Sequence, residues 1–225
     1  MKVLGIDTSS KTLSVALGDA QDIITEESHL LDRRHSSMLV LKIKEMLKKS
    51  RFFLKDVDVF VVGLGPGSFT GLRIGVSTIK GFGIATKKPC IGISSIDGLA
   101  LNVDEENKTI VPIIDAKRQQ VYSAIYKKEN GLVVRKSDYL LLNVDRLMRK
   151  VKGPCVFLGD GIPLYKDRIR HFNKTATFLE EEYWYPRAGN LIKLALRNRK
   201  GLKNTNLARL RPIYLYPKDC QVRKN

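Results

Sequence analysis

The pattern of apolar residues is densest over 57–64, where β-branched and aromatic side chains occupy consecutive positions. A run of this kind is typical of a strand that is buried on both faces of a sheet. Residues 65–67, Gly-Pro-Gly, then form a turn, and a helix is predicted over 71–85. Ser68 and Thr70 can cap this helix, because their side-chain oxygens accept amide hydrogens of its first turn.

The predicted helix contains several glycines, although each costs about 1 kcal/mol relative to alanine in a helix interior. These glycines are Gly71, Gly75, Gly81 and Gly83. Gly71 and Gly75 are one turn apart, so they let another backbone or helix approach the same face. The sequence therefore predicts a very close contact along this face.

A second helix is predicted over 36–49, with lysines and a glutamate among its polar positions. Its apolar positions are Met38, Leu39, Leu41, Ile43, Met46 and Leu47, and Val40 widens the arc. This arc is wider than one core-facing stripe requires. A second packing surface is therefore expected, either inside the fold or on a partner.

The chain repeats one strand pattern. VLGID at 3–7 with SVAL at 14–17 matches VPIID at 111–115 with YSAI at 122–125. Later, VFLGDG at 156–161 resembles the strand and glycine turn that the first half places before its long helix. Two matches in the same order indicate an internal duplication, although two common strand patterns can also agree by coincidence.

The remaining predicted elements are strands over 23–29, 90–93 and 132–136, helices over 95–101, 143–150, 162–171 and 187–200, and an extended tail over 207–217. Together they predict an α/β protein of two related lobes, each a mixed sheet flanked by helices. The polar, acidic segment 102–108 is the candidate boundary. We therefore expect an N-terminal lobe over 1–102 with the glycine-loop helix, and a basic C-terminal lobe over 103–225.

The net charge of +17 is unevenly divided along the chain. Residues 1–116 contain 15 Lys or Arg and 14 Asp or Glu, whereas residues 117–225 contain 25 and 9. A strongly basic half beside a neutral half indicates a polyanionic partner such as RNA, or an acidic protein. A lysine-rich proteome or a thermophile surface would raise the charge generally, but it explains the asymmetry less well.

Composition also narrows the class of protein. No run of eighteen apolar residues occurs, and the first residues lead directly into a strand, so we expect a soluble, unsecreted, cytoplasmic protein without membrane contact. Cys90, Cys155 and Cys220 are far apart and form no CxxC pair. Structural zinc and a disulfide framework are therefore not expected, which suits a reducing cytosol.

A glycine-rich turn before a helix is a candidate anion site. The known fingerprints do not match, however. Leu72 and Arg73 replace the Lys-Ser/Thr of a Walker loop, Thr70 replaces the last glycine of GxGxxG, and Pro66 breaks GxSxG. The turn is therefore interpreted first as a tight, capped connection. The weaker candidate is a nucleotide or anion loop formed by Asp7, Ser9, Gly67, Ser68 and Thr70.

Five segments resemble the TsaB (YeaZ) family over residues 1 to about 217: GIDTSS with SVAL, RRHSSML, GLGPGSFTGLRIG, DAKRQQVYSAIY and RPIYLYP. The resemblance implies the actin/hexokinase/Hsp70-like (ribonuclease H-like) fold. It also implies a subunit of the machinery that makes threonylcarbamoyladenosine in tRNA. In that machinery the family pairs with its catalytic paralogue TsaD, which transfers the threonylcarbamoyl group, and works with the ATPase TsaE.

The same resemblance implies a subunit without catalytic or metal-binding residues. The paralogue holds its metal with two histidines one helical turn apart, whereas here Leu39 stands one turn after His35. Asp7 and Asp115 could hold a metal nucleotide, but serines at 9–10 and the segment 117–120 replace the glycines of a phosphate turn. We therefore expect no tightly bound cofactor, with ATP or ADP bound only within the complex. Strand-end aspartates that bond the turn backbone are the preferred interpretation.

The leading hypothesis is that the helices near 35–49 and 71–85 bind TsaD, as half of a four-helix interface. The candidate interface residues are His35, Met38, Leu39, Lys42, Gly71, Leu72, Gly75 and Ile79. The basic second half would help to hold tRNA, and the isolated chain would form a homodimer. The alternatives are an autonomous ATP-dependent kinase or hydrolase of the same fold, and a simple RNA-binding module. Against the RNA-binding module, this chain lacks the stacking aromatics of single-strand binders.

Overall fold

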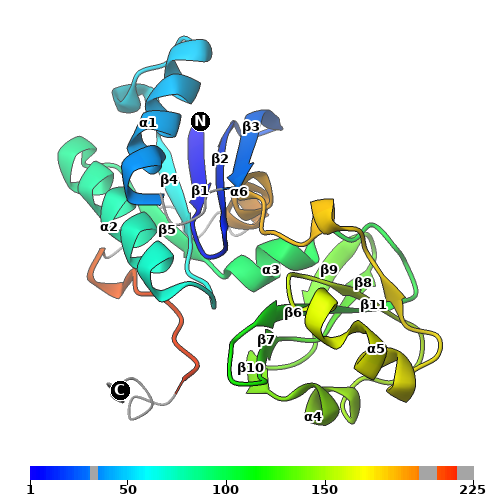
Figure 1. The fold of residues 1–225 in the computed structure, drawn as a ribbon. Coiled ribbons are helices and arrows are strands. Elements are labelled where there is room, and N and C mark those ends of the chain that lie inside the picture. The colour runs from blue at the N-terminus through cyan, green and yellow to red at the C-terminus, as the bar shows by residue number, and fades with distance from the viewer. Residues whose placement is uncertain (31–34, 198–206, 217–225) are drawn as a thin grey trace, which may run out of the picture. The chain divides into compact units, whose positions relative to one another are not determined.

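The structure is a computed structural model that describes residues 1–30, 35–197 and 207–216. The chain forms two compact units, one of residues 1–98 with 186–213 and the other of residues 99–185 with 214–225. In each unit a sheet is flanked by helices (Figure 1). The predicted α/β class is therefore confirmed.

The first unit contains a five-stranded sheet in the order β3-β2-β1-β4-β5. Its strands are β1 (Val3–Asp7), β2 (Thr12–Gly18), β3 (Ile23–Leu30), β4 (Val59–Gly63) and β5 (Cys90–Ile93). The first three strands pair antiparallel, and β4 and β5 run parallel to β1. Every residue of β1 and β4 is buried, as the continuous apolar runs predict for strands covered on both faces.

Helices cover both faces of this sheet. On one face, Phe60 and Val62 of β4 share a core cluster with α1 (His35–Lys49) and α2 (Phe69–Thr86). On the other face, Val59 and Val61 pack against α6 (Ala188–Arg197). The alternation follows the period of two of a strand, which directs successive side chains to opposite faces.

The position of α6 differs from the predicted division into lobes at 1–102 and 103–225. The helix packs on β1, β2 and β4 of the first unit, so closely that a Cβ at Gly5 would lie 2.8 Å from Ile192 Cγ1. The physical reason is that β1 and β4 are apolar on both faces, and α1 and α2 cover only one of them. The apolar stripe of α6 covers the other face: Ala188, Gly189, Leu191, Ile192 and Ala195 are buried.

The second unit contains a seven-stranded sheet in which β10-β7-β6-β11-β12 form the main path and β8 pairs with β6 and β9. The strands are β6 (Thr109–Asp115), β7 (Val121–Ser123), β8 (Tyr126–Glu129), β9 (Leu132–Arg135), β10 (Leu140–Leu142), β11 (Cys155–Leu158) and β12 (Thr177–Phe178). The helices are α4 (Val144–Met148) and α5 (Ile162–Phe172), close to the predicted ranges. The segment 122–125 of the repeated pattern is not one continuous strand, since β7 pairs with one end of β6 and β8 with the other.

The short elements complete the two units. They are the helix α3 (Ser95–Ala100) and the 3-10 turns η1 (Leu54–Asp56), η2 (Glu181–Tyr183) and η4 (Leu207–Arg209). The tail predicted to be extended over 207–217 therefore begins as a helical turn, and its last residue lies outside the described part.

In the second unit the Asn102 side-chain amide connects the end of α3 to the segment around η2. It donates to the Tyr183 and Tyr185 carbonyls, both at 2.9 Å.

The predicted duplication is borne out by the topology of the sheets. In the first unit β1 pairs antiparallel with β2 and parallel with β4, and in the second unit β6 pairs antiparallel with β7 and parallel with β11. Both central strands end in aspartate, Asp7 and Asp115. The two units therefore repeat one arrangement of strand, hairpin turn and parallel strand.

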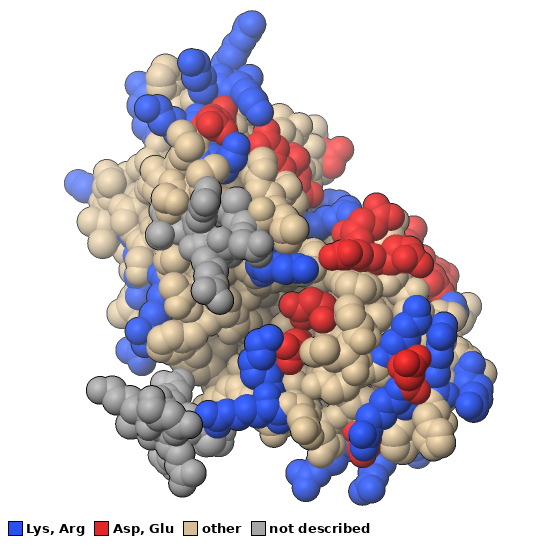
Figure 2. All heavy atoms as spheres, in the orientation of Figure 1, with Lys and Arg blue, Asp and Glu red and all other residues tan. Residues whose placement is uncertain are grey.

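The asymmetry of charge between the halves of the sequence is reversed between the units. The described residues of the first unit carry 17 Lys or Arg and 9 Asp or Glu, and those of the second carry 15 and 12. The described residues of 186–213 carry five Lys or Arg and no Asp or Glu, and this segment belongs to the first unit. In the second unit the basic side chains concentrate on α4 and α5, as Figure 2 shows. Among the described residues, no helix is long and apolar enough to span a membrane.

The packing of α6 predicts how the first unit responds to truncation. Ile192→Ala should lower the free energy of unfolding by about 2–5 kcal/mol, because it leaves a cavity against the central strands. The neighbouring exposed change Lys193→Ala should stay within about 0.5 kcal/mol of the parent. Urea denaturation followed by circular dichroism measures both, and equal small effects would contradict this packing.

Candidate functional site

The β1–β2 turn is held by the carboxylate of Asp7, which is 1% exposed. One of its oxygens accepts hydrogen bonds from the Ser9 amide (2.8 Å) and hydroxyl (2.6 Å). The other oxygen accepts from the Ser95 hydroxyl at 2.6 Å. The interpretation of Asp7 as a strand-end aspartate that bonds the turn backbone is therefore confirmed.

The glycine loop between β4 and α2 closes onto this turn. The Ser68 amide donates to the Ser9 carbonyl at 2.6 Å, and a Cβ at Gly67 would overlap that same oxygen. The Gly65 amide donates to the Ser95 hydroxyl at 3.0 Å, so Ser95 links the loop to Asp7. The loop is therefore built to fit the turn backbone closely.

The structure brings together four of the five predicted loop residues, Asp7, Ser9, Gly67 and Ser68. Ser68 caps α2, because its hydroxyl accepts from the Gly71 amide at 3.2 Å. Thr70, predicted as a second cap, instead lies exposed inside the first turn of the helix. Anion or nucleotide binding by this loop stays a prediction.

Gly71 and Gly75 do allow a close approach, and the approaching group is Thr8 of the same chain. A Cβ at Gly71 would overlap the Thr8 carbonyl oxygen, and one at Gly75 would overlap its hydroxyl. The Thr8 hydroxyl also donates to the Gly71 carbonyl at 2.7 Å. The glycines that suggested a partner helix are thus explained by the hairpin turn of their own unit.

This packing corrects much of the predicted interface. Leu39, Leu72 and Ile79 are 0% exposed, and Gly71 and Gly75 are buried, so these residues form the core of the first unit and not its surface. Met38 is partly buried against the same core. Lys42 is partly exposed and pairs with Glu45 at 2.9 Å. His35 begins α1, and its side chain lies outside the described residues.

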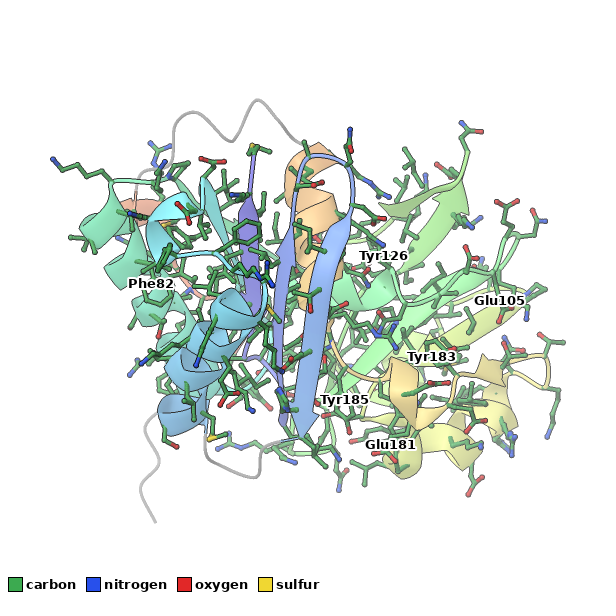
Figure 3. All side chains as sticks on the ribbon, turned by 90° about the horizontal axis from the view of Figure 1, so that it is seen from above. Phe82, Glu105, Tyr126, Glu181, Tyr183 and Tyr185 are labelled. Atoms are coloured by element: carbon green, nitrogen blue, oxygen red, sulfur yellow. The ribbon has the colours of Figure 1, made fainter. Side chains whose placement is uncertain are left out.

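The wide apolar arc of α1 does leave a second surface. Val40 is 51% exposed and Leu41 45% exposed. On α2 the exposed positions include Ser77, Gly81, Ile84 and Ala85, and a Cβ at Gly81 would meet no atom within 4 Å. The neighbouring Phe82 packs inward, its ring 5.6 Å from that of Phe60 (Figure 3). We call Val40, Leu41, Ser77, Gly81, Ile84 and Ala85 the outer face of α1 and α2.

The second unit contains the counterpart of the first turn. The Lys117 amide donates to Asp115 at 2.9 Å, and the Asp115 amide donates to Asp160 at 3.0 Å. A Cβ at Gly159 would overlap the Ile113 carbonyl oxygen. Residues 117–119 all have positive φ, which lets the hairpin turn tightly without glycine. As in the first unit, the turn aspartate bonds its own backbone.

The tail returns to this hairpin. The Tyr216 hydroxyl donates to the Ala116 carbonyl at 2.7 Å, and its ring meets the edge of Tyr122 at 6.1 Å. Burial raises the pKa of Tyr122 to about 12. Tyr216 therefore fastens the end of the described chain to the β6–β7 turn.

The two cysteines of the described residues, Cys90 and Cys155, are buried. The described residues contain no group of three or more His, Cys, Asp or Glu that could hold a metal ion. Burial raises the pKa of both Cys90 and Cys155 to about 11, and the Cys90 thiol donates to the Ile79 carbonyl at 3.3 Å. These two thiols are therefore protonated near neutral pH, and Cys220 lies outside the described residues.

Comparison with known proteins identifies the family. A family model described as TsaD, tRNA N6-adenosine threonylcarbamoyltransferase, matches residues 24–222. The tRNA threonylcarbamoyladenosine biosynthesis protein TsaB of Bacillus subtilis is 34% identical over 182 residues, which is 80% of each chain. The chain belongs to the TsaB family.

Other TsaB-like proteins agree over nearly the whole length. TsaB of Escherichia coli is 27% identical over 221 residues, covering 96% of this chain and 94% of that protein. A solved Pseudomonas aeruginosa structure, described as an uncharacterized protein with similarity to the peptidase YeaZ, aligns with a TM-score of 0.82 at 24% identity. It covers 96% of this chain and 99% of that one. The expected actin/hexokinase/Hsp70-like fold is confirmed.

Two site residues were missed from the sequence, Thr8 and Ser95. The Ser95 hydroxyl donates to Asp7 and accepts from the Gly65 amide. A signal was present, because β1, β4 and β5 are parallel and polar residues at their carboxyl ends meet at one edge of the sheet. Thr8 carried no such signal, since its partners Gly71 and Gly75 are far away in sequence.

Two alanine substitutions distinguish the glycine of α2 that contacts Thr8 from a glycine of the same helix that faces open space. Gly71→Ala should lower the free energy of unfolding by about 1–3 kcal/mol, because the added methyl group overlaps the Thr8 carbonyl. Gly81→Ala should raise it by up to about 1 kcal/mol, because alanine favours the helix and meets open space. Chemical denaturation measures both, and effects of the same sign would contradict the assignment.

The raised thiol pKa values predict slow alkylation of the folded protein. At pH 8 most of each thiol is protonated, since the pKa of Cys90 and of Cys155 lies at about 11, so iodoacetamide should label both far more slowly than in urea. Peptide mass spectrometry reads each cysteine separately. Equal labelling rates in the folded and unfolded states would refute the burial of these thiols.

Proposed function

We propose that this chain is a non-catalytic subunit required for threonylcarbamoyl transfer to adenosine in tRNA. In this role it binds and activates the transferase TsaD and works with the ATPase TsaE. Membership of the TsaB family supports the pathway, because relatives carry the name tRNA threonylcarbamoyladenosine biosynthesis protein. The match to the TsaD family model over most of the chain supports a relationship to the transferase itself.

The observation that carries the proposal is the outer face of α1 and α2. Val40, Leu41 and Ile84 are 51%, 45% and 70% exposed, although each is a large apolar residue on a helix that already buries its inner face. Covering such a side chain contributes about 1.5–3 kcal/mol. Ser77, Gly81 and Ala85 add small side chains at a spacing of four, which lets a partner helix pack closely. Two helices of TsaD would complete a four-helix interface.

The hydrogen bonds within the hairpin turns favour a non-catalytic role over a catalytic one. In the first unit the carboxylate of Asp7 bonds Ser9 and Ser95, and the amide of Ser68 bonds the Ser9 carbonyl. These groups hold the loop closed on the turn. ATP or ADP would then bind within the complex, and the isolated chain would pair with a second copy through the same outer face.

An autonomous ATP-dependent enzyme is the competing function, favoured by the fold alone. Calorimetry of the isolated chain with ATP and magnesium discriminates between the two. The proposal expects neither micromolar binding nor turnover. Both together would replace it with a kinase or hydrolase.

Substitutions on the outer face test the interface without disturbing the core. Leu41→Asp and Gly81→Arg should each abolish co-purification with TsaD while leaving the chain folded, because both side chains point away from the unit's own packing. Leu132→Asp, at a 48% exposed residue of β9, is the matched control and should pair normally. Retained pairing of both outer-face variants would reject this interface.

Reconstitution tests the pathway. Threonylcarbamoyladenosine should form in tRNA with TsaD, TsaE and this chain together, and formation should fall at least about tenfold without it, which corresponds to about 1.4 kcal/mol. Mass spectrometry of digested tRNA measures the modified nucleoside. Full modification without this chain would remove the proposed requirement.

A further inference from the structure

The net positive charge of the second unit comes from one layer. Residues 144–174, which include α4 and α5, carry eight Lys or Arg and three Asp or Glu. The other described residues of this unit carry seven and nine. The unit is therefore slightly acidic except on this layer, and Figure 2 shows the basic side chains gathered over α4 and α5. We call Arg146, Arg149, Lys150, Lys152, Lys166, Arg168, Arg170 and Lys174 the α4–α5 basic layer.

The helices that carry the layer are packed against each other through buried side chains. Val144, Leu147 and Met148 of α4 share a buried cluster with Ile162 and Ile169 of α5. At one corner the Asn173 amide donates to the Gly153 carbonyl at 3.0 Å, which holds Lys152 and Lys174 on neighbouring segments. The backbone that carries these charges is therefore already ordered before a ligand binds, and only the Lys and Arg side chains lose rotamer freedom.

Most of these charges face solvent. The exposed Arg168 donates two hydrogen bonds from its guanidinium to Asp145, both at 2.5 Å, and so joins the two helices. Lys166 and Arg170 lie over the Phe178 ring, 5.6 Å and 5.4 Å from its centroid. Seven of the eight basic residues are exposed and Lys166 is partly buried, so the layer offers several cations to one large anion.

An exposed aromatic residue accompanies the charges. Phe172, at the end of α5, is 50% exposed and meets the His171 ring edge-on at 5.9 Å. Leu164 on the same helix is 62% exposed. Cations that contact phosphates, combined with an exposed ring on which a base can stack, are typical of surfaces that bind RNA. An acidic protein would use the cations but would not require the ring.

We propose that the α4–α5 basic layer binds the phosphate backbone of RNA, and that in the complex this RNA is the tRNA substrate. The inference rests on the proposed function, which brings tRNA to the complex. It assigns to the second unit a role different from that of the outer face of α1 and α2. The contacts are electrostatic and independent of sequence, so the layer positions tRNA and does not select it.

The experiment compares two triple variants that remove the same charge. In the patch variant Lys150, Lys152 and Lys174 become glutamine, and in the control variant Lys55, Lys87 and Lys127 become glutamine, all six being exposed. Fluorescence anisotropy measures the binding of an unmodified tRNA transcript to each full-length chain, alone and with TsaD, across a salt series. Co-purification with TsaD is measured on the same proteins.

The patch variant should bind tRNA at least about tenfold more weakly, and its log–log salt slope should be smaller by about 2–3, because each lost phosphate contact lowers the slope by nearly 1. The control variant should keep the affinity and slope of the parent. Equal weakening of both variants, or unchanged binding by the patch variant, would overturn the inference. So would binding of the layer to vesicles of anionic lipid without binding to tRNA.

The pairing measurement keeps the two proposals separate. If the patch variant still pairs with TsaD and binds tRNA as the parent does, the RNA surface is rejected and the proposed function stands. If outer-face variants fail to affect pairing while the patch variant loses tRNA, the interface is rejected and the RNA surface stands.

Discussion

The carbonyl group of Thr8 lies where a side chain would otherwise begin on Gly71, and its hydroxyl bonds the carbonyl of that same glycine. This contact holds the start of α2 against the end of β1. The Ser68 amide, which bonds the Ser9 carbonyl, closes the glycine loop over the turn. Because α2 is fixed in this way, its inner residues join those of α1 in one core cluster. The other sides of the two helices include the exposed residues of the outer face.

The hydrogen bonds of Asp7, the residue before Thr8, bear on the chemistry of the turn. A carboxylate at the end of a central strand can hold a metal or a water molecule when its oxygens face a ligand. Here the oxygens of Asp7 accept hydrogen bonds from Ser9 and Ser95. The second unit repeats this arrangement of a turn aspartate and a close glycine. Asp115 accepts a hydrogen bond from the Lys117 amide, and Gly159 lies against the Ile113 carbonyl. The duplicated fold thus has two turns that are closed by hydrogen bonds of their own unit.

Charge and fold follow different divisions of this chain. The basic segment of α6 covers the second face of the first sheet, because β1 and β4 are apolar on both faces. Positive charge in the second unit is concentrated on α4 and α5 instead of being spread over it. Two surfaces with different physical character therefore result, one apolar on α1 and α2 and one basic on α4 and α5.

The sequence by itself determined the α/β class, the duplication, most strand and helix ranges and the closeness of the Gly71 and Gly75 contact. These features depend on local periodicity, turn residues and the absence of a side chain. Only the tertiary structure decided that Thr8 makes this contact, that Leu39 and Ile79 are core residues, and that α6 belongs to the first unit. The physical reason is that an apolar stripe or a glycine specifies that something packs against it. Which group does so depends on contacts between residues far apart in the chain.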